Sequence, residues 1–322
     1  MKHSLLSAFA ALSMLAATPG TSHAQTFPTK PMRIVAPFAP GGGTDFIARQ
    51  VADKLSQKLG QPVLVENRPG AGGNLGAELA LKAPADGYTL LLIAGSYTVN
   101  ASLYKLPFDS GNDISPIIQL SQGPFVVAVN PTVKAGSLKE FIALARSEPG
   151  KLSYASAGAG SITHLATELF LDMAKINIVH VPYKGTGPAQ TDTIAGNTQL
   201  LFGSVATTLP FIKSGRLRAL AVTTPRRIPA AAEIPTVAEA GVPGYEVILW
   251  HGLIAPKGVP KAIVEQLNHA ANDVLKVKDM EERLAGDGVS PAGGTPEQFG
   301  ALIKSDIARW AKIVKQANVK IE

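Results

Sequence analysis

The sequence lacks cysteine altogether, which excludes disulfide bonds, thiolate nucleophiles and cysteine-ligated metal sites. It also lacks an apolar run of about 20 residues free of charges and prolines, the length that a membrane-spanning helix requires. The zinc motif H-E-x-x-H is absent, so His164, His180, His251 and His269 predict no metal site, and we expect no cofactor. Cohesion must come from an ordinary core, which a composition of 46% hydrophobic residues can supply.

Concentrated positive charge is missing as well. The formal net charge is +6, but the densest basic cluster consists only of Arg216, Arg218, Arg226 and Arg227. Nucleic-acid binding would call for a basic stripe interleaved with aromatic residues, and aromatics make up 6% of the chain, so no nucleic-acid partner is expected. The basic excess suits an anionic ligand and is equally typical of exported proteins.

Two enzyme motifs fail on their spacing. The segment from Gly70 to Gly76 departs from the dinucleotide pattern G-x-G-x-x-G because position 75 is leucine, and Ser96 stands where an acidic ribose partner is needed. The hydrolase motif G-x-S-x-G is absent, since Ser156 has no glycine two residues before it and Ser161 has none two residues after it. We therefore predict that the protein is not an enzyme; a hydrolase using the segment from Ser156 to His164 is the alternative.

The N-terminus has the features of a secretory signal peptide. Lys2 supplies the positive start, Leu5 to Ala17 is apolar, and Ser22-His23-Ala24 offers small residues for cleavage. The mature chain would begin near Gln25, in the periplasm. Removal of residues 1–24 leaves 29 basic against 24 acidic residues, a formal charge of +5.

The mature sequence alternates short apolar, β-branched runs with helical patterns, which predicts βαβ units and an α/β class with mostly parallel sheets. The alternation begins with a strand at Met32 to Pro37, restarts after Gly123, and returns near Trp250. We therefore expect two lobes, one formed by residues 25–124 with 249–322 and the other by residues 125–248, with two crossings that form a hinge.

Two strand-to-helix turns are candidates for ligand binding. The first, from Pro37 to Asp45, contains three glycines before a helix, where unpaired N–H groups and the helix dipole favour an anion. A tight turn capped by Thr44 or Asp45 explains the same pattern. The second, from Tyr154 to His164, adds hydroxyl groups, and two such turns facing each other could clamp a small dianion.

An ordered series of motifs along the mature chain resembles the Bug family of substrate-binding proteins, the receptors of tripartite tricarboxylate transporters. The motifs are Ala36-Pro37-Phe38-Ala39-Pro40-Gly41-Gly42-Gly43-Thr44-Asp45, Val65-Glu66-Asn67-Arg68-Pro69-Gly70-Ala71-Gly72-Gly73, Asp86-Gly87-Tyr88-Thr89-Leu90-Leu91, His164-Leu165-Ala166 with Glu168, Val181-Pro182-Tyr183-Lys184-Gly185, Arg218-Ala219-Leu220-Ala221-Val222 and Ile234-Pro235-Thr236-Val237-Ala238-Glu239-Ala240-Gly241. One departure follows Gly185, where Thr186-Gly187-Pro188-Ala189-Gln190 precedes Thr191 in place of the more usual small or apolar residues.

The resemblance implies a two-lobed venus-flytrap fold that captures a small carboxylate for a membrane transporter. The ligand could be an aliphatic dicarboxylate, an amino acid or an aromatic acid, and the alternative role is that of a ligand-sensing partner in a signalling system. We expect a monomer. The implied ligand-binding residues of the two loops are Phe38, Gly42, Gly43, Thr44, Asp45, Ser156, Gly158, Gly160, Ser161, Thr163 and His164. Ser96, Thr98, Gly203 and Ser204 are added because they follow strand ends that would line the cleft.

Overall fold

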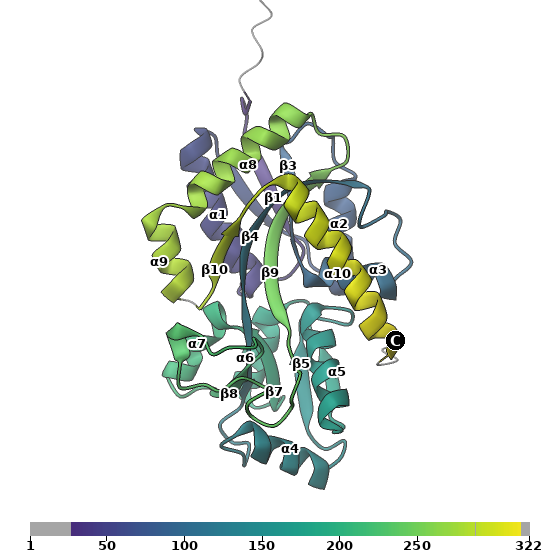
Figure 1. Ribbon diagram of the computed structural model, residues 1–322, viewed down its shortest axis with the longest axis vertical. Helices are drawn as coiled ribbons and strands as arrows, with labels where there is room; N and C mark the ends of the chain where they lie inside the picture. Colours follow the sequence, from purple (N-terminus) through teal and green to yellow (C-terminus); the bar gives the residue numbers. More distant parts are fainter. Residues whose placement is uncertain (1–26, 287, 317–322) are drawn as a thin grey trace, which may run out of the picture.

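The computed structural model describes residues 27–286 and 288–316, and the predicted signal peptide lies outside the described residues. Figure 1 shows the chain as two lobes joined by long central strands. The strands are β1 (Met32–Ala36), β2 (Val63–Asn67), β3 (Thr89–Ala94), β4 (Ile114–Val129), β5 (Ser153–Ser156), β6 (Val179–Pro182), β7 (Leu200–Ser204), β8 (Arg218–Val222), β9 (Ile248–Pro256) and β10 (Ser290–Gly293). The α-helices are α1 (Gly43–Leu59), α2 (Asn74–Leu81), α3 (Gly95–Leu103), α4 (Leu138–Ser147), α5 (Ile162–Ala174), α6 (Thr186–Ala195), α7 (Val205–Lys213), α8 (Lys261–Leu275), α9 (Lys278–Gly286) and α10 (Pro296–Gln316).

The strands follow the order β2-β1-β3-β9-β4-β7-β5-β6, with β8 and β10 also pairing with β4. The long strand β4 belongs to both lobes: its residues Ile114 to Pro124 pair with β9, and Phe125 to Val129 pair with β7 and β8. The expected two-lobed α/β architecture is thereby confirmed.

The sheets are mixed, whereas the sequence pattern predicted mostly parallel pairing. β1 pairs in parallel with β2 and β3, and β5 pairs in parallel with β6 and β7. All pairings of β4, and that of β3 with β9, are antiparallel. The reason is the shared centre: β4 leaves the first lobe and β9 returns to it, so the two crossing strands run in opposite directions.

The helix α10 reaches from the first lobe toward the second (Figure 1). Its Trp310 is buried in the same apolar cluster as Leu165 and Phe170 of α5, and Arg309 donates to the carbonyl of Glu246 at 3.1 Å. The C-terminal helix therefore contacts both lobes, although its residues were expected to belong to the first.

One α-helix and one strand were not predicted from the sequence. The helix α3, GSYTVNASL, follows β3 without an intervening loop, and its β-branched and small residues gave no clear helical stripe. The four-residue strand β10 has the sequence SPAG, in which proline and glycine disfavour a strand prediction. Its antiparallel pairing with β4 provides the structure that propensity does not.

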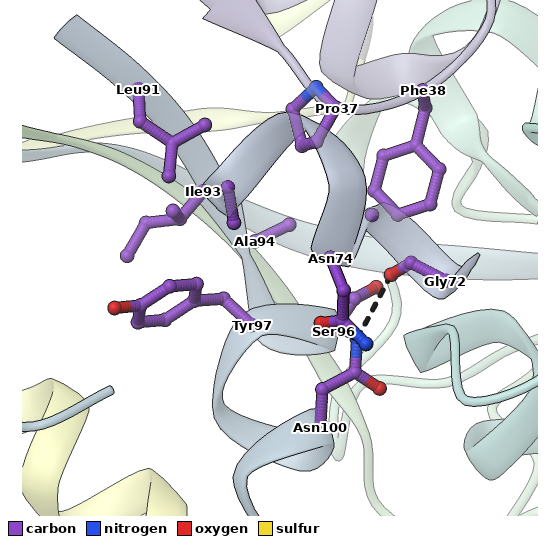
Figure 2. A pocket seen from close by; sticks show the side chains of 12 residues that line it. Pro37, Phe38, Gly72, Asn74, Leu91, Ile93, Ala94, Ser96, Tyr97 and Asn100 are labelled. Atoms are coloured by element: carbon purple, nitrogen blue, oxygen red, sulfur yellow. Dashed lines mark hydrogen bonds between the residues drawn. The ribbon is translucent and has the colours of Figure 1, made fainter. Parts of the chain in front are cut away.

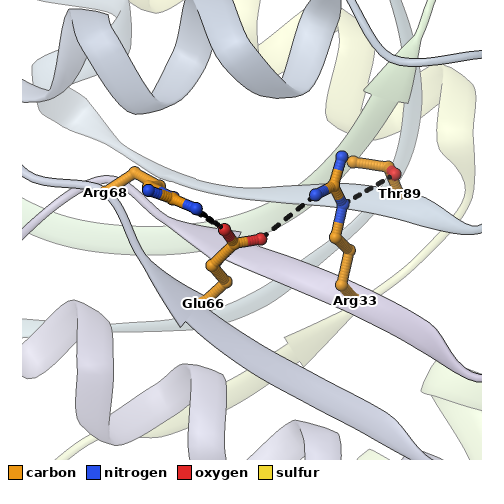
Figure 3. A network of polar contacts seen from close by, with 4 residues as sticks. All are labelled: Arg33, Glu66, Arg68 and Thr89. Atoms are coloured by element: carbon orange, nitrogen blue, oxygen red, sulfur yellow. Dashed lines mark hydrogen bonds and ion pairs between the residues drawn. The ribbon is translucent and has the colours of Figure 1, made fainter.

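The loop after β2 is anchored by a polar network on the first sheet, drawn in Figure 3. Glu66 accepts hydrogen bonds from both Arg33, at 3.2 Å, and Arg68, while Arg33 also donates to the hydroxyl of Thr89 on β3 at 3.1 Å. The network links three neighbouring strands and fixes the start of the loop that carries Gly72 toward the second lobe.

Candidate functional site

Five helices begin around one cavity between the lobes. Each helix follows a strand directly or after a short turn. Parallel strands of an α/β sheet end on the same side, so the helices that follow them begin close together, where ligands commonly bind. The helices α1 and α3 come from the first lobe, and α5, α6 and α7 from the second. Their first turns or capping residues contribute Gly43, Thr44, Ser96, Ile162, Thr163, Thr186 and Ser204 to the cavity wall.

The cavity wall contains no Lys, Arg, Asp or Glu. Besides the helix starts, it is formed by Phe38, Ala94, Phe125, Ala157, Leu249 and His251. A negative charge here would be stabilised by backbone N–H groups and by the positive ends of helix dipoles, rather than by an opposing ionised side chain. The helix starts are therefore the groups of this wall that could interact with a negative charge.

The first loop leaves its helix start free for a ligand. Gly42 is the N-cap of α1, and no side chain caps this helix, so its first amide groups remain available as donors. The Asp45 side chain stabilises the loop itself. Its carboxylate accepts hydrogen bonds from Gly41 N at 3.1 Å, Asn67 Nδ2 at 3.0 Å and Arg49 Nε at 3.1 Å. Burial alone would raise the pKa of Asp45, but these hydrogen bonds lower it below its ordinary value.

In the second loop, the hydroxyl groups of Ser161 and Thr163 form hydrogen bonds within the loop itself. Ser161 caps α5 by accepting from the amide of His164 at 3.3 Å, and Thr163 Oγ1 accepts from the amide of Ala157 at 2.9 Å. The amide of Gly160 donates to His164 Nδ1 at 3.2 Å. These bonds fix the shape of the loop before any ligand arrives.

Three aromatic rings stack beneath this loop. The rings of His164 and His180 lie 4.1 Å apart, and Tyr154 stacks on the other side of His180 at 4.8 Å. Burial lowers the pKa of His164 to about 4, and burial together with the nearby His164 lowers that of His180 to about 3, so both rings are neutral at pH 7. The stack is a rigid support for the loop.

Ser156 lies 2.6 Å from His180 Nε2, a serine–histidine pair that bears on the hydrolase alternative. The serine is fully buried and does not line the cavity, and its hydroxyl oxygen accepts from the amide of Gly158 at 3.1 Å. A histidine with a pKa near 3 is also too weak a base to activate a hydroxyl at neutral pH. The Ser156–His180 pair therefore stabilises the second loop.

The structure brings six of the fifteen predicted site residues to the cavity wall: Phe38, Gly43, Thr44, Ser96, Thr163 and Ser204. Seven others lie in or beneath the two loops without lining it: Gly42, Asp45, Ser156, Gly158, Gly160, Ser161 and His164.

The remaining two, Thr98 and Gly203, do not line the cavity either. Thr98 sits further along α3, fully buried, and donates to the carboxylate of Asp306 on α10 at 2.6 Å. Gly203 is a packing residue: a Cβ there would lie 2.2 Å from Thr208 Oγ1. Thr186 and His251 were not predicted as site residues, and both line the cavity.

The lobes are in direct contact around the cavity, which is a closed arrangement. Hydrogen bonds of 2.9 Å join Ala39 N to the carbonyl of Lys184, Ile162 N to Ser96 Oγ, and Tyr104 Oη to the carbonyl of Ala159. The cavity is partly open to solvent, and its free volume is about 20 Å³, close to the space of one water molecule. A ligand of several carbons needs a wider separation of the lobes to enter.

A second small cavity adjoins the first and shares Phe38, Ala94 and Ser96 with it (Figure 2). At its edge, Asn100 Nδ2 donates to the carbonyl of Gly72 at 3.0 Å and to Asn74 Oδ1 at 2.9 Å. This asparagine therefore fixes the turn at Gly72, which lies close to the second lobe: a Cβ on Gly72 would lie 2.6 Å from the carbonyl oxygen of Ala159.

Within residues 27–286 and 288–316 no group of three or more metal-ligating side chains comes together, and no helix is long and apolar enough to cross a membrane. Two lobes that enclose a neutral, donor-lined cavity define a solute-binding protein.

Comparison with known proteins identifies the family. Residues 47–319 match the family described as the tripartite tricarboxylate transporter family receptor, and the chain belongs to this family. Protein BugT of Bordetella pertussis is 38% identical over 302 residues, which cover 93% of each chain. Because the family and its structural neighbours are binding proteins, the prediction that this chain is not an enzyme is confirmed.

Solved structures agree with the fold. The periplasmic binding protein BugD superposes with a TM-score of 0.89 at 33% identity, covering 92% of this chain and all (100%) of that one. An adipate-bound protein of R. palustris gives 0.88 at 36% identity, covering 91% and 99%. MatC of Rhodopseudomonas palustris with bound malate gives 0.86 at 31% identity, covering 89% and 100%.

Proposed function

We propose that the protein is a periplasmic receptor that captures a small carboxylate between its lobes and delivers it to a tripartite tricarboxylate-type membrane transporter. The observation that carries the proposal is the convergence of five helix N-termini on one cavity whose wall contains no ionised side chain. Such a wall favours a small anion. The adipate and malate bound by two structural neighbours belong to this chemical class.

The contacts between the lobes support the following proposed working cycle. Lobe I consists of residues 25–124 and 249–322, lobe II of residues 125–248, and the protein acts as a monomer. The ligand enters an open form, and closure brings the helix starts of both lobes onto it. Binding shifts the equilibrium toward the closed form without making or breaking a covalent bond. Residues 1–24 act as a signal peptide that is removed near Ala24.

A thermal-shift screen of the purified protein tests the ligand class. The compounds are malate, succinate, glutarate, adipate, aspartate, glutamate, benzoate and nicotinate, with the corresponding amides as uncharged controls. A ligand at 100 times its Kd stabilises the folded protein by about 2.7 kcal/mol, a clear rise in melting temperature. Small-angle scattering should show compaction with the compound that stabilises most. Stabilisation by amides and not by carboxylates would overturn the proposal.

A further inference from the structure

His251 is the least satisfied polar group at the cavity. It lies on β9, opposite Ser121 of β4 in the strand register, where the two crossing strands pass between the lobes. Its side chain is 2% exposed and lines the cavity. Nδ1 lies 3.2 Å from Ser121 Oγ, whereas buried Nε2 has no hydrogen-bond partner among the described residues.

A buried polar atom without a partner is rare in folded proteins and calls for a physical reason. Nε2 faces the place where α1 meets the second lobe, because a Cβ added to Gly43 would lie 4.0 Å from Nε2 and 2.9 Å from Ser204 Oγ. These three residues come from three elements and surround one end of the cavity. The other end is formed by Ser96, Ile162 and Thr163, at the starts of α3 and α5.

The protonation of the ring decides what it can recognise. Burial lowers the pKa of His251 to about 4, so the imidazole is neutral at pH 7 and carries one N–H. When the Ser121 hydroxyl donates to Nδ1, the proton lies on Nε2, which becomes a donor toward the cavity. An anion at this end of the cavity selects that tautomer.

We infer that His251 Nε2 donates a hydrogen bond to one carboxylate of a dicarboxylate ligand, whose other carboxylate lies at the starts of α3 and α5. The inference deepens the function proposed above and rests on it. A monocarboxylate bound at the starts of α3 and α5 would leave Nε2 of His251 without a partner, and sites built to hydrogen-bond a group discriminate strongly against ligands that lack it. His251 is thus a specificity-determining residue of the receptor.

Two substitutions separate the two nitrogen atoms of the ring. His251→Asn keeps an amide near the position of Nδ1, next to Ser121, and removes the atom that faces the cavity. His251→Gln places an amide N–H near the position of Nε2. Calorimetry on wild type and both variants uses adipate and malate, with hexanoate and 3-hydroxybutyrate as counterparts in which a methyl group replaces one carboxylate.

We expect His251→Asn to weaken adipate or malate binding about 10- to 100-fold, as for loss of a hydrogen bond to a charged group, and His251→Gln to bind within about threefold of wild type. Neither variant should change binding of the monocarboxylates. If both variants bind the dicarboxylates like wild type, the role of His251 is refuted while the receptor function stands. If the wild-type protein binds no carboxylate, the proposed function fails and this inference with it.

A measurement on the wild-type protein covers the case in which both variants are unstable. In ¹⁵N-histidine-labelled protein saturated with adipate or malate, the His251 resonance should report a proton on Nε2 that exchanges slowly with water. An Nε2 without a proton in the complex would overturn the inference.

Discussion

Gly43→Ala is the sharpest test of the closed arrangement. Gly43 begins α1 in the first lobe, and a Cβ at this position would lie 2.7 Å from the Cβ and 2.9 Å from Oγ of Ser204 in the second lobe. Carbon atoms in favourable contact lie about 3.5–4.0 Å apart, so the lobes must separate by roughly 1 Å to admit one methyl group. The added atom therefore opposes closure.

The magnitude follows from the cost of overpacking. Forcing an extra methyl group into a packed contact costs about 1–3 kcal/mol, which corresponds to a loss of affinity of about 5- to 150-fold. Alanine also favours a helix over glycine, by as much as about 1 kcal/mol. Because the clash arises only where the lobes meet, the unliganded variant should melt at the same temperature as wild type or slightly higher, while its affinity falls.

Calorimetry with the best carboxylate of the screen, together with thermal melting, measures both effects. Gly111→Ala is the matched control, since a Cβ there meets its nearest neighbour at 3.5 Å, far from the cavity. The double variant Gly43→Ala with Ser204→Gly removes the opposing Cβ together with a hydroxyl of the cavity wall, so it should recover only part of the affinity. Unchanged binding by Gly43→Ala would show that the ligand is not bound with these helix starts in contact.

Three further outcomes are expected. Ser161→Ala should lower the free energy of unfolding by about 0.5–2 kcal/mol in urea titrations, because Ser161 caps α5; an unchanged free energy would contradict the capping role. The free energy of unfolding should be nearly constant between about pH 7 and 9 and fall as pH drops from about 6.5 toward 4, by up to about 1.4 kcal/mol per pH unit for each buried histidine. The reason is that burial holds the pKa of His164 and of His251 at about 4 in the folded protein, so the unfolded chain binds more protons in this window; urea titrations at several pH values measure it, and greater stability at pH 5 than at pH 7 would refute it. Raising salt from about 0.05 to 0.5 M should change carboxylate affinity less than about twofold, since no ionised side chain lines the cavity; a tenfold loss by calorimetry would point to an exposed cation in the site.

Much of the fold could be predicted from the sequence, because the strongest sequence patterns reflect local structure. Glycine-rich turns after apolar strands located the starts of α1 and α5, and the restart of the alternation after Gly123 located the crossing in β4. Whether neighbouring strands pair in parallel or antiparallel was harder to predict. No local pattern shows that β4 continues from one lobe into the other, since its apolar residues read the same in parallel and antiparallel sheets.

The residues that line the cavity were harder to predict from the sequence, because lining a cavity is a property of tertiary structure. A motif places a residue in a loop, but it does not show whether the side chain faces the ligand or stabilises the loop. Ser156 and His164 stabilise the loop. His251 shows the reverse case. A histidine inside the otherwise apolar strand ILWHGLIAP is a buried polar group in need of a partner, and that anomaly was a usable signal.

The two loops divide the work of binding unequally. In the second loop the amides of Ala157, Gly158 and Gly160 are already paired with side chains of the same loop, so these donors are not free for a ligand. In the first loop α1 has no side-chain cap, and Asp45 is held by other partners. Of the two loops, the first therefore offers more free backbone donors to the proposed ligand. Substitutions in the second loop should act mainly by changing its shape, whereas those at Gly43 and Thr44 act on the contact itself.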